Sequence, residues 1–334
     1  MKTRKASTLP AILQAYFTDR LIRQRNASPN TISGYRDSFR LLLGFAEEKL
    51  GKAPSDLDIC DLDAPFITAF LNHLETQRGN GPRTRNLRLA AIHSFFRYVS
   101  LREPAYAAIC QRILAIPTKR FERKTIEFLT SAETQALLAA PDLSTSTGRR
   151  DRAMILLTVQ TGLRVSELTG LRCKDIVLAT GAHVRCQGKG RKERCTPLRR
   201  ETIGVLAAWL KERNGTLDSP AFPSARGGAL SRDAVEHLIA KHARTAQQTT
   251  PSLRSKTVTP HVLRHTAAMD LLQHGVDRSV IALWLGHESI ETTHIYLHAD
   301  LRLKERALAR TTPIDVKPGR YRPNDGLLAF LEAL

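Results

Sequence analysis

The chain has 334 residues, 42% of them hydrophobic, and its 51 lysines and arginines exceed its 32 aspartates and glutamates by a formal charge of +19. This length exceeds that of a typical single domain, so we expect two. The charge favours a polyanionic partner, because lysine and arginine neutralise phosphates and release condensed counterions. The sequence lacks a run of 18 apolar residues, a signal peptide and a basic membrane anchor, so it predicts no membrane association. Five cysteines without a Cys-x-x-Cys pair indicate reduced thiols in a cytoplasmic protein.

The first third of the chain is expected to form a bundle of four helices. Amphipathic segments are separated by Gly, Pro and Asn, and one of them opens on Ser28 and Pro29 and stops at Gly51, as helices do. The four segments are LPAILQAYFTDRLIRQR, SPNTISGYRDSFRLLLGFAEEKLG, DAPFITAFLNHLETQRG and GPRTRNLRLAAIHSFFRYVSLRE. Together they predict a compact helical domain over residues 1–116.

Basic residues concentrate at the end of this bundle and directly after it. A solvated helix face would explain Arg83, Arg85 and Arg88 on the fourth segment, but the overall charge favours phosphate contact. Residues 117–128, PTKRFERKTIEF, lack apolar periodicity and predict an interdomain linker that could cross the backbone of a bound duplex. The basic residues of this linker are Lys119, Arg120, Arg123 and Lys124.

Residues 129–312 are expected to form a mostly helical domain with a small sheet. The apolar segment RRDRAMILLTVQTG predicts a buried helix that ends at Gly162. The segment DIVLATGAHVRCQGKGRKERCTPL alternates apolar and polar residues around three glycines, which predicts two or three antiparallel strands. Further helices are expected at 199–213, 231–246, 260–274, 276–286 and 289–309. The fold class is therefore α+β, mainly α, and a Pro- and Gly-rich tether with a short apolar helix follows at 313–334.

Residues 261–296 contain five histidines, two arginines and a final tyrosine. His261 and His265 have the spacing of two zinc ligands on one helix face. However, Val262 stands where a zinc protease helix requires glutamate, and Arg264 would repel a divalent cation. We therefore expect no catalytic metal. Any one of these histidines alone is more simply explained as a surface residue or a hydrogen-bonded core residue.

Three further motifs weaken that simple explanation. TGLRVSEL places Arg164 directly after the glycine-ended helix, with Glu167 within reach of a salt bridge. GKGRKER places Lys189 between two glycines at the expected hairpin turn. LGHES places His287 at a helix end, nine residues before Tyr296.

Two arginines, two histidines, a lysine and a tyrosine suit phosphoryl transfer without a metal. Planar guanidinium groups bind non-bridging phosphate oxygens and stabilise the charge of the transition state. Histidine can donate a hydrogen bond or move a proton, and lysine can protonate a departing alkoxide. A tyrosine hydroxyl, with an ordinary pKa of about 10, becomes a usable nucleophile beside such cations. Tyr296 is therefore interpreted as the attacking group.

In the order and spacing of TGLRVSEL, GKGRKER, HVLRHTAA, LGHESIETT and IY, the chain resembles the tyrosine recombinases, or phage-type integrases. The Xer-like and mobile-element members of bacteria are the most similar. The resemblance covers nearly the whole chain and implies an N-terminal SAM-like core-binding domain, a basic linker and a catalytic domain. The catalytic residues that it implies are Arg164, Lys189, His261, Arg264, His287 and Tyr296, with Glu167 bracing the site.

The resemblance also implies a mechanism. Tyr296 would attack the scissile phosphate, form a 3′-phosphotyrosyl bond and release a 5′-hydroxyl, without metal, ATP or another cofactor. The paired arginines would bind the phosphate, and Lys189 would protonate the leaving 5′-oxygen. Lys192, three residues along the same turn, competes with Lys189 for that role.

An assembly on double-stranded DNA follows from the same resemblance. A homotetramer would hold two duplex sites, possibly together with a partner recombinase, and the last helix of each protomer would dock on its neighbour. Two other functions stay open from the sequence: a type IB topoisomerase-like enzyme that relaxes supercoils, and a non-catalytic DNA-binding regulator built on the same fold.

Overall fold

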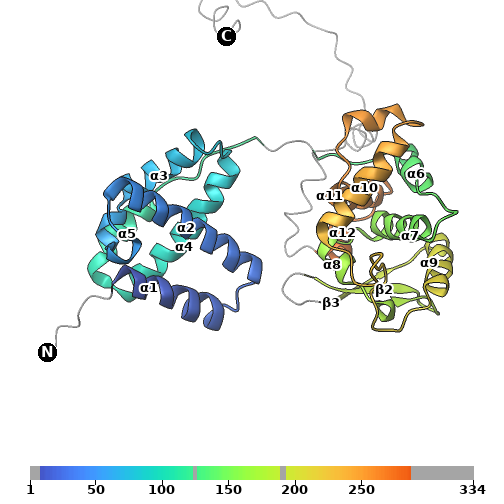
Figure 1. Ribbon diagram of the computed structural model, residues 1–334, viewed down its shortest axis with the longest axis horizontal. Helices are drawn as coiled ribbons and strands as arrows, with labels where there is room; N and C mark the ends of the chain where they lie inside the picture. The colour runs from blue at the N-terminus through green and yellow to red at the C-terminus, as the bar shows by residue number, and fades with distance from the viewer. Residues whose placement is uncertain (1–7, 123–125, 189–192, 287–334) are drawn as a thin grey trace, which may run out of the picture. The chain divides into compact units, whose positions relative to one another are not determined.

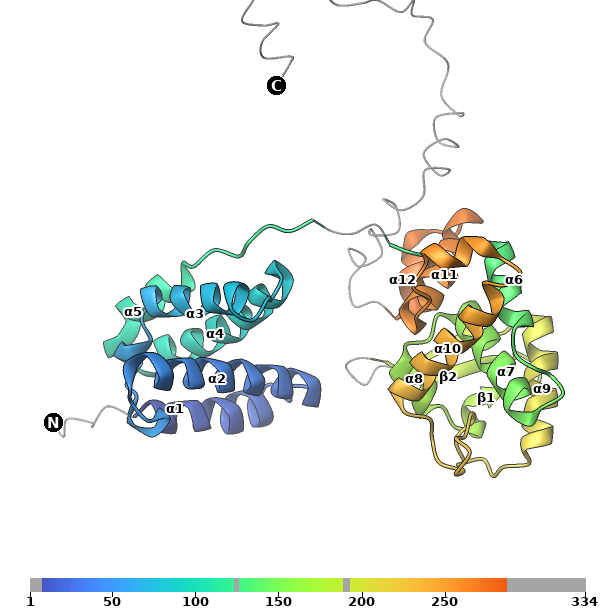
Figure 2. The same cartoon turned by 45° about the horizontal axis from the view of Figure 1, so that its top comes forward.

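The computed structural model describes residues 8–122, 126–188 and 193–286. The chain divides into two compact units, Met1–Lys124 and Thr125–Leu334, and the division falls within the segment expected to be the linker. Each unit is described by itself (Figures 1 and 2). None of the helices in the described ranges has both the length and the apolar character that a membrane crossing requires.

The N-terminal unit is a helical bundle with the expected helix ends. The side chain of Ser28 accepts a hydrogen bond from the backbone N–H of Thr31, and Gly51 ends the same helix in the left-handed conformation at φ 65°. The helices are α1 (Leu9–Ala15), which continues as a π-helix (Tyr16–Gln24), α2 (Pro29–Leu50), α3 (Ala64–Thr76), α4 (Pro82–Arg102) and α5 (Ala107–Leu114). Helix α4 packs against α2, α3 and α5 (Figure 1).

Helix α5 was not predicted from the sequence. Its eight residues follow a 3₁₀ turn at Pro104–Tyr106 and are too few to show a clear apolar period. Cys110 and Ile113 are nevertheless buried, because α5 covers α3 and α4 and completes the core of the bundle.

The C-terminal unit is α+β and mainly α, as predicted. Three antiparallel strands, β1 (Ile176–Val177), β2 (His183–Gln187) and β3 (Glu193–Pro197), pair in the order β1-β2-β3. The helices are α6 (Ser131–Ala139), α7 (Ser146–Thr161), α8 (Val165–Gly170), α9 (Arg200–Arg213), α10 (Arg232–Ala246), α11 (Pro260–Gln273) and α12 (Arg278–Leu285). The helix expected at 289–309 and the tail at 313–334 lie outside the described residues.

The buried helix α7 leads directly to Gly162 and Arg164 of the candidate active site. It packs against α6, α9 and α11 (Figure 2), and its apolar residues, among them Met154, Ile155 and Leu157, belong to the core of the unit. Gly162 ends the helix in the left-handed conformation at φ 64°, as the sequence predicted. The chain therefore turns sharply from α7 into α8 beside α11.

Both ends of the predicted linker are attached to structured elements. At one end, Asn86 of α4 donates to the carbonyl oxygen of Lys119 at 2.8 Å and accepts from its N–H at 3.0 Å. At the other end, the N–H of Leu129 donates to Thr266 Oγ1 of α11 at 2.9 Å. Lys256 joins this second attachment by donating to the carbonyl oxygen of Phe128 at 2.9 Å.

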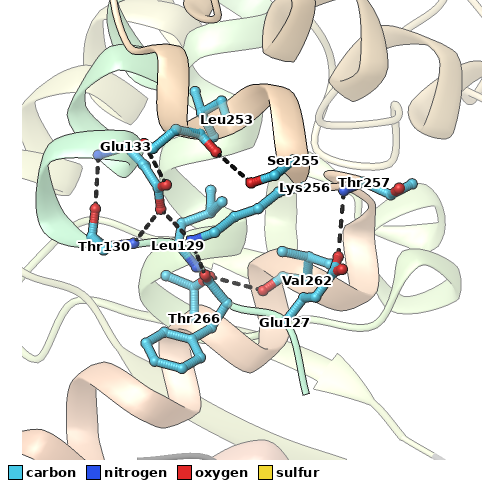
Figure 3. A network of polar contacts seen from close by, with 12 residues as sticks. Glu127, Leu129, Thr130, Glu133, Leu253, Ser255, Lys256, Thr257, Val262 and Thr266 are labelled. Carbon is cyan, nitrogen blue, oxygen red and sulfur yellow. Dashed lines mark hydrogen bonds and ion pairs between the residues drawn. The ribbon is translucent and has the colours of Figure 1, made fainter. Parts of the chain in front are cut away.

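A buried carboxylate stabilises that second attachment (Figure 3). Glu133 accepts from Lys256 Nζ at 2.6 Å, from Ser252 Oγ at 2.7 Å and from the N–H of Thr130 at 2.8 Å. Burial raises the pKa of Glu133, but the bonds from Lys256 and the other donors outweigh it and hold the pKa below its usual value. An ionised network thus fixes the start of the C-terminal unit against α11.

Candidate active site

Arg264 joins the ends of two helices in the C-terminal unit. It lies one turn into α11, whose first turn contains Pro260, and only 5% of the residue is exposed. Its Nη1 donates to the carbonyl oxygen of Gly162 at 2.5 Å, and its Nη2 donates to that of Leu285 at 2.7 Å. The guanidinium therefore satisfies carbonyl groups at the C-terminal ends of α7 and α12, which have no partner within their own helices.

Arg164 reaches the same turn from another direction. It is the residue that precedes α8, and its backbone N–H donates to Glu167 Oε2 at 2.8 Å. Its Nη1 donates to Glu167 Oε1 at 2.8 Å, and its Nη2 donates to the carbonyl oxygen of Gly286 at 2.9 Å. Because Leu285 and Gly286 are consecutive, the two arginines bind neighbouring carbonyl groups at the C-terminal end of α12.

Two glycines make this close approach possible. Gly162 and Gly286 both adopt the left-handed conformation at φ 64°. A Cβ atom on Gly162 would lie 2.5 Å from Leu285 Cδ2, and one on Gly286 would lie 2.7 Å from Arg194 Nη1. Both positions therefore favour glycine for conformation, and an added Cβ would also displace the facing side chain.

Glu167 is held between two arginines. Its side chain is only 2% exposed, and Arg194 of β3 donates to its Oε1 and Oε2 at 2.9 Å each, in addition to the bonds from Arg164. Burial is the largest influence on its pKa and raises it, but the bonds from Arg194 and then Arg164 lower the pKa below its usual value. The carboxylate is therefore ionised at neutral pH.

Arg194 was not singled out from the sequence. It is the last residue of the GKGRKER motif, in which only the lysines were expected to act. The alternation of strand residues could have indicated that Arg194 points inward, because Arg194 shares one face of β3 with the buried Thr196.

Two histidines of α11 lie beside the arginines. The rings of His261 and His265 stack with their centroids 6.5 Å apart. Burial first, and then the positive charge of Arg264, lower the pKa of His261. Burial, His261 and Arg264 lower the pKa of His265 to about 4. Both imidazoles are therefore neutral at pH 7 and can donate or accept a hydrogen bond.

The structure brings together Arg164, Glu167 and Arg264, with His261 one turn before Arg264 on α11. The other residues expected in the site lie outside the described residues: Lys189, Lys192, His287 and Tyr296. The paired register Gln187↔Glu193 places the two lysines in the sequence of the β2–β3 turn. His287 directly follows Gly286, whose carbonyl oxygen Arg164 contacts.

The arginines of α4 have different surroundings. Arg83 is exposed, whereas only 4% of Arg85 is exposed. Arg85 Nη1 donates to the carbonyl oxygen of Pro117 at 3.3 Å, and its Nε lies 3.7 Å from Glu75 Oε2. The guanidinium of Arg85 is thus occupied inside the unit, and its expected phosphate contact stays a prediction.

The other basic residues that were expected to contact DNA also differ in exposure and in their partners. Arg88 donates to the carbonyl oxygen of Gly34 and to Ser38 Oγ, both at 3.1 Å, and so joins α4 to α2. Lys119 is exposed but pairs with Glu75 at 2.7 Å, and Arg120 is exposed. Arg123 and Lys124 lie outside the described residues.

Comparisons with known proteins give matches to both units of the chain. The Phage integrase family model matches residues 127–302, and the model of the Phage integrase N-terminal SAM-like domain matches residues 15–103. A Sinorhizobium fredii protein, y4rC, whose name assigns it to the integrases and recombinases, is 57% identical over 330 residues, 99% of each chain. Tyrosine recombinase XerD of Pseudomonas putida is 34% identical over 86% of this chain and 93% of its own length.

A solved structure shows the same fold. The XerH site-specific recombinase, in a post-cleavage complex with palindromic difH substrate, is 25% identical with a TM-score of 0.67, over 86% of this chain and 81% of that one. These matches favour neither a topoisomerase nor a non-catalytic regulator. The chain belongs to the phage integrase family and is a tyrosine recombinase of the Xer-like or mobile-element kind, an enzyme of site-specific DNA recombination.

Proposed function

We propose that this recombinase cuts and rejoins DNA through a phosphotyrosyl intermediate, with Tyr296 as the nucleophile and Arg164 and Arg264 as ligands of the scissile phosphate. The observation that carries the proposal is that the two guanidinium groups donate to the consecutive carbonyl oxygens of Gly286 and Leu285. Groups fixed in this way need no rearrangement when charge develops on the phosphate, which is the basis of electrostatic catalysis.

The anchoring of Arg164 is compatible with phosphate binding. A guanidinium has five N–H donors, and the hydrogen bonds of the Arg164 side chain to Glu167 and Gly286 use its two terminal nitrogens, each of which carries a second hydrogen. Its side chain is 27% exposed. Arg164 can therefore bind a phosphate while it keeps its contacts with Glu167 and Gly286.

The proposed chemistry is a pair of transesterifications. The hydroxyl oxygen of Tyr296 attacks the phosphorus, a 3′-phosphotyrosyl bond forms, and the bond from phosphorus to the 5′-oxygen breaks. Lys189 gives a proton to that oxygen. His261, which is neutral at pH 7, accepts the phenolic proton or donates to the phosphate. A 5′-hydroxyl of the partner strand then attacks the phosphotyrosine, so the bond energy is conserved without ATP.

A 5′-bridging phosphorothiolate substrate distinguishes Lys189 from Lys192. Its sulfur leaves without protonation, so it restores cleavage only where the missing group is the general acid. We expect Lys189→Ala to be slow on the ordinary substrate and fast on the phosphorothiolate. If Lys192→Ala shows this rescue and Lys189→Ala does not, Lys192 is the acid.

We further propose that the enzyme works in the cytoplasm as a homotetramer on two duplex sites. The net charge of +19 supports a DNA partner, and the related XerH structure is a complex with its difH substrate. In the N-terminal unit, exposed Arg83 and Arg120 are the proposed phosphate contacts. The apolar segment at 325–334 is proposed to dock on the neighbouring protomer, so its deletion should spare cleavage but impair assembly and strand exchange.

Covalent capture tests the central proposal. A random-sequence duplex library with one nicked strand is incubated with the protein, and SDS-resistant adducts are isolated and sequenced to obtain the site. We expect peptide mapping to place the DNA on Tyr296 through a 3′-phosphate. Tyr321→Phe serves as the control and should form the adduct, whereas Tyr296→Phe should bind the site without forming it. An adduct formed by Tyr296→Phe would overturn the proposal.

A further inference from the structure

Arg194 has no place in the mechanism above, yet it makes one of the best-formed ion pairs in the C-terminal unit. Its two terminal nitrogens donate to the two carboxylate oxygens of Glu167 at 2.9 Å each. The side chains of Arg194 and Glu167 are 10% and 2% exposed. This is the bidentate geometry that makes arginine–carboxylate pairs both strong and directional.

Arg194 contacts the same elements that hold Arg164. The nitrogen Arg194 Nη1 and the nitrogen Arg164 Nη1 share one acceptor, Glu167 Oε1, at 2.9 and 2.8 Å. The guanidinium of Arg194 also packs against Gly286, because a Cβ atom there would lie only 2.7 Å from its Nη1. Gly286 is the residue whose carbonyl oxygen accepts from Arg164. Arg194 thus supports both anchors of the Arg164 guanidinium.

The charges of the group show why this support matters. Two guanidinium groups and one carboxylate leave a net charge of +1 for Arg164, Glu167 and Arg194 together. Without Arg194, Glu167 would still be a buried carboxylate. Of the two arginines that now bind it, only Arg164 would be left. A buried charge that loses its partner is costly, so Glu167 would draw the Arg164 guanidinium toward itself. The resulting neutral pair would offer little charge to a phosphate.

We propose that Arg194 is a positioning residue that neutralises Glu167, so that Arg164 keeps its orientation and its net charge for the scissile phosphate. Arg194 itself does not touch the DNA in this proposal. The inference rests on the proposed role of Arg164 as a phosphate ligand. The β2–β3 strand pair would then have two functions. Its turn contains Lys189 and Lys192, and β3, directly after that turn, supplies the charge that neutralises Glu167.

Single-turnover cleavage of the captured site in nicked form tests the inference. We expect Arg194→Met and Arg194→Gln to slow cleavage on the order of 10- to 100-fold, while the Kd for the same duplex changes little. Arg194→Lys keeps the charge but cannot form the bidentate pair, so it should recover part of the rate and cleave faster than Arg194→Met and Arg194→Gln. The control is Arg185→Met on β2, whose side chain is 48% exposed and 3.7 Å from Asp175, and it should cleave normally.

A double variant separates charge from packing. In Arg194→Met with Glu167→Gln, no unpaired carboxylate remains, so cleavage should be faster than in Arg194→Met alone. If Arg194 only stabilised the fold, the losses of cleavage rate caused by Arg194→Met and by Glu167→Gln would add in the double variant. Thermal unfolding of each variant reports folding, and Arg194→Gln and Arg194→Lys decide the matter if Arg194→Met does not fold.

Each result has a definite meaning. Wild-type cleavage by Arg194→Gln, an Arg194→Lys variant as slow as Arg194→Met, or a double variant slower than Arg194→Met would each overturn the positioning role. Normal cleavage by Arg164→Ala would overturn the proposed function of that residue and this inference with it. Slow Arg164→Ala together with normal Arg194→Gln would overturn the inference alone.

Discussion

Arg164 and Arg264 are 100 positions apart in the sequence, but they donate to consecutive carbonyl oxygens, those of Gly286 and Leu285, at 2.9 and 2.7 Å. The separation of two successive carbonyl groups therefore sets the spacing between the two guanidinium groups. Arg264 also donates to Gly162, which lies two residues before Arg164 in the chain. The ends of α7, α8, α11 and α12 are thus joined through two side chains, and a change at any of these ends is expected to disturb both arginines.

Loss of either arginine should slow cleavage with little loss of DNA binding. Removing one donor that stabilises transition-state charge typically costs on the order of 10² to 10³ in rate, and we expect this of Arg164→Ala and Arg264→Ala. Arg264→Ala should also lower the free energy of unfolding, because Gly162 and Leu285 lose a buried partner. Single-turnover cleavage and urea unfolding measure the two effects. Normal cleavage by either variant would exclude that residue from the site.

Gly286→Ala should be both destabilising and slow. The left-handed conformation alone costs an alanine on the order of 1 kcal/mol, and the new Cβ would lie 2.7 Å from Arg194 Nη1. Gly275→Ala is the matched control, since Gly275 has φ 81° but no atom within 4 Å of its Cβ position. We expect both variants to lose stability in urea unfolding, but only Gly286→Ala to lose at least about tenfold in cleavage rate. Equal rates for the two variants would contradict the proposed clash with Arg194.

The features that the sequence predicted best are those with local physical causes. Gly51 and Gly162 end their helices as expected, because a left-handed residue after the last turn is specified by the glycine itself. The pair of Arg164 and Glu167 is also local, since residues three apart at the start of a helix face each other. The fold class followed from the same local periods.

Contacts between distant segments could not be predicted in this way. Arg194 meets Glu167 across 27 positions, and whether a strand arginine points inward depends on the register of β2 and β3. Arg85 looked like its exposed neighbour Arg83 in the sequence, but Glu75 of α3 and Pro117 occupy its guanidinium. A single sequence contains the charge of such residues but not the distance to their partners.

Arg83 and Arg85 should therefore respond differently to substitution. Arg83→Ala should weaken binding of the captured duplex and reduce the slope of log Kd against log salt by about 1, the change expected for one phosphate contact. Arg85→Ala should leave that slope unchanged and lower the free energy of unfolding. It removes a buried guanidinium that donates to the carbonyl oxygen of Pro117 and lies beside the Glu75 carboxylate. Fluorescence anisotropy over a salt series and urea unfolding test the pair. A reduced slope for Arg85→Ala would show that its guanidinium turns outward on DNA.

His265 should make the C-terminal unit sensitive to acid. Burial, His261 and Arg264 lower its pKa to about 4, below the value of about 6.5 expected in the unfolded chain. Protonation therefore favours unfolding, so the contribution of His265 is complete above pH 6.5 and is lost as the pH falls toward 4. Between pH 7.5 and 5 this loss is at most on the order of 2 kcal/mol, because His265 is only partly buried. Urea unfolding at both values should show a smaller loss in His265→Gln than in the wild type. His274→Gln, a change at a histidine with a 73% exposed side chain, is the control and should retain the wild-type loss. If His265→Gln and His274→Gln behave alike, His265 is not the source of the acid sensitivity.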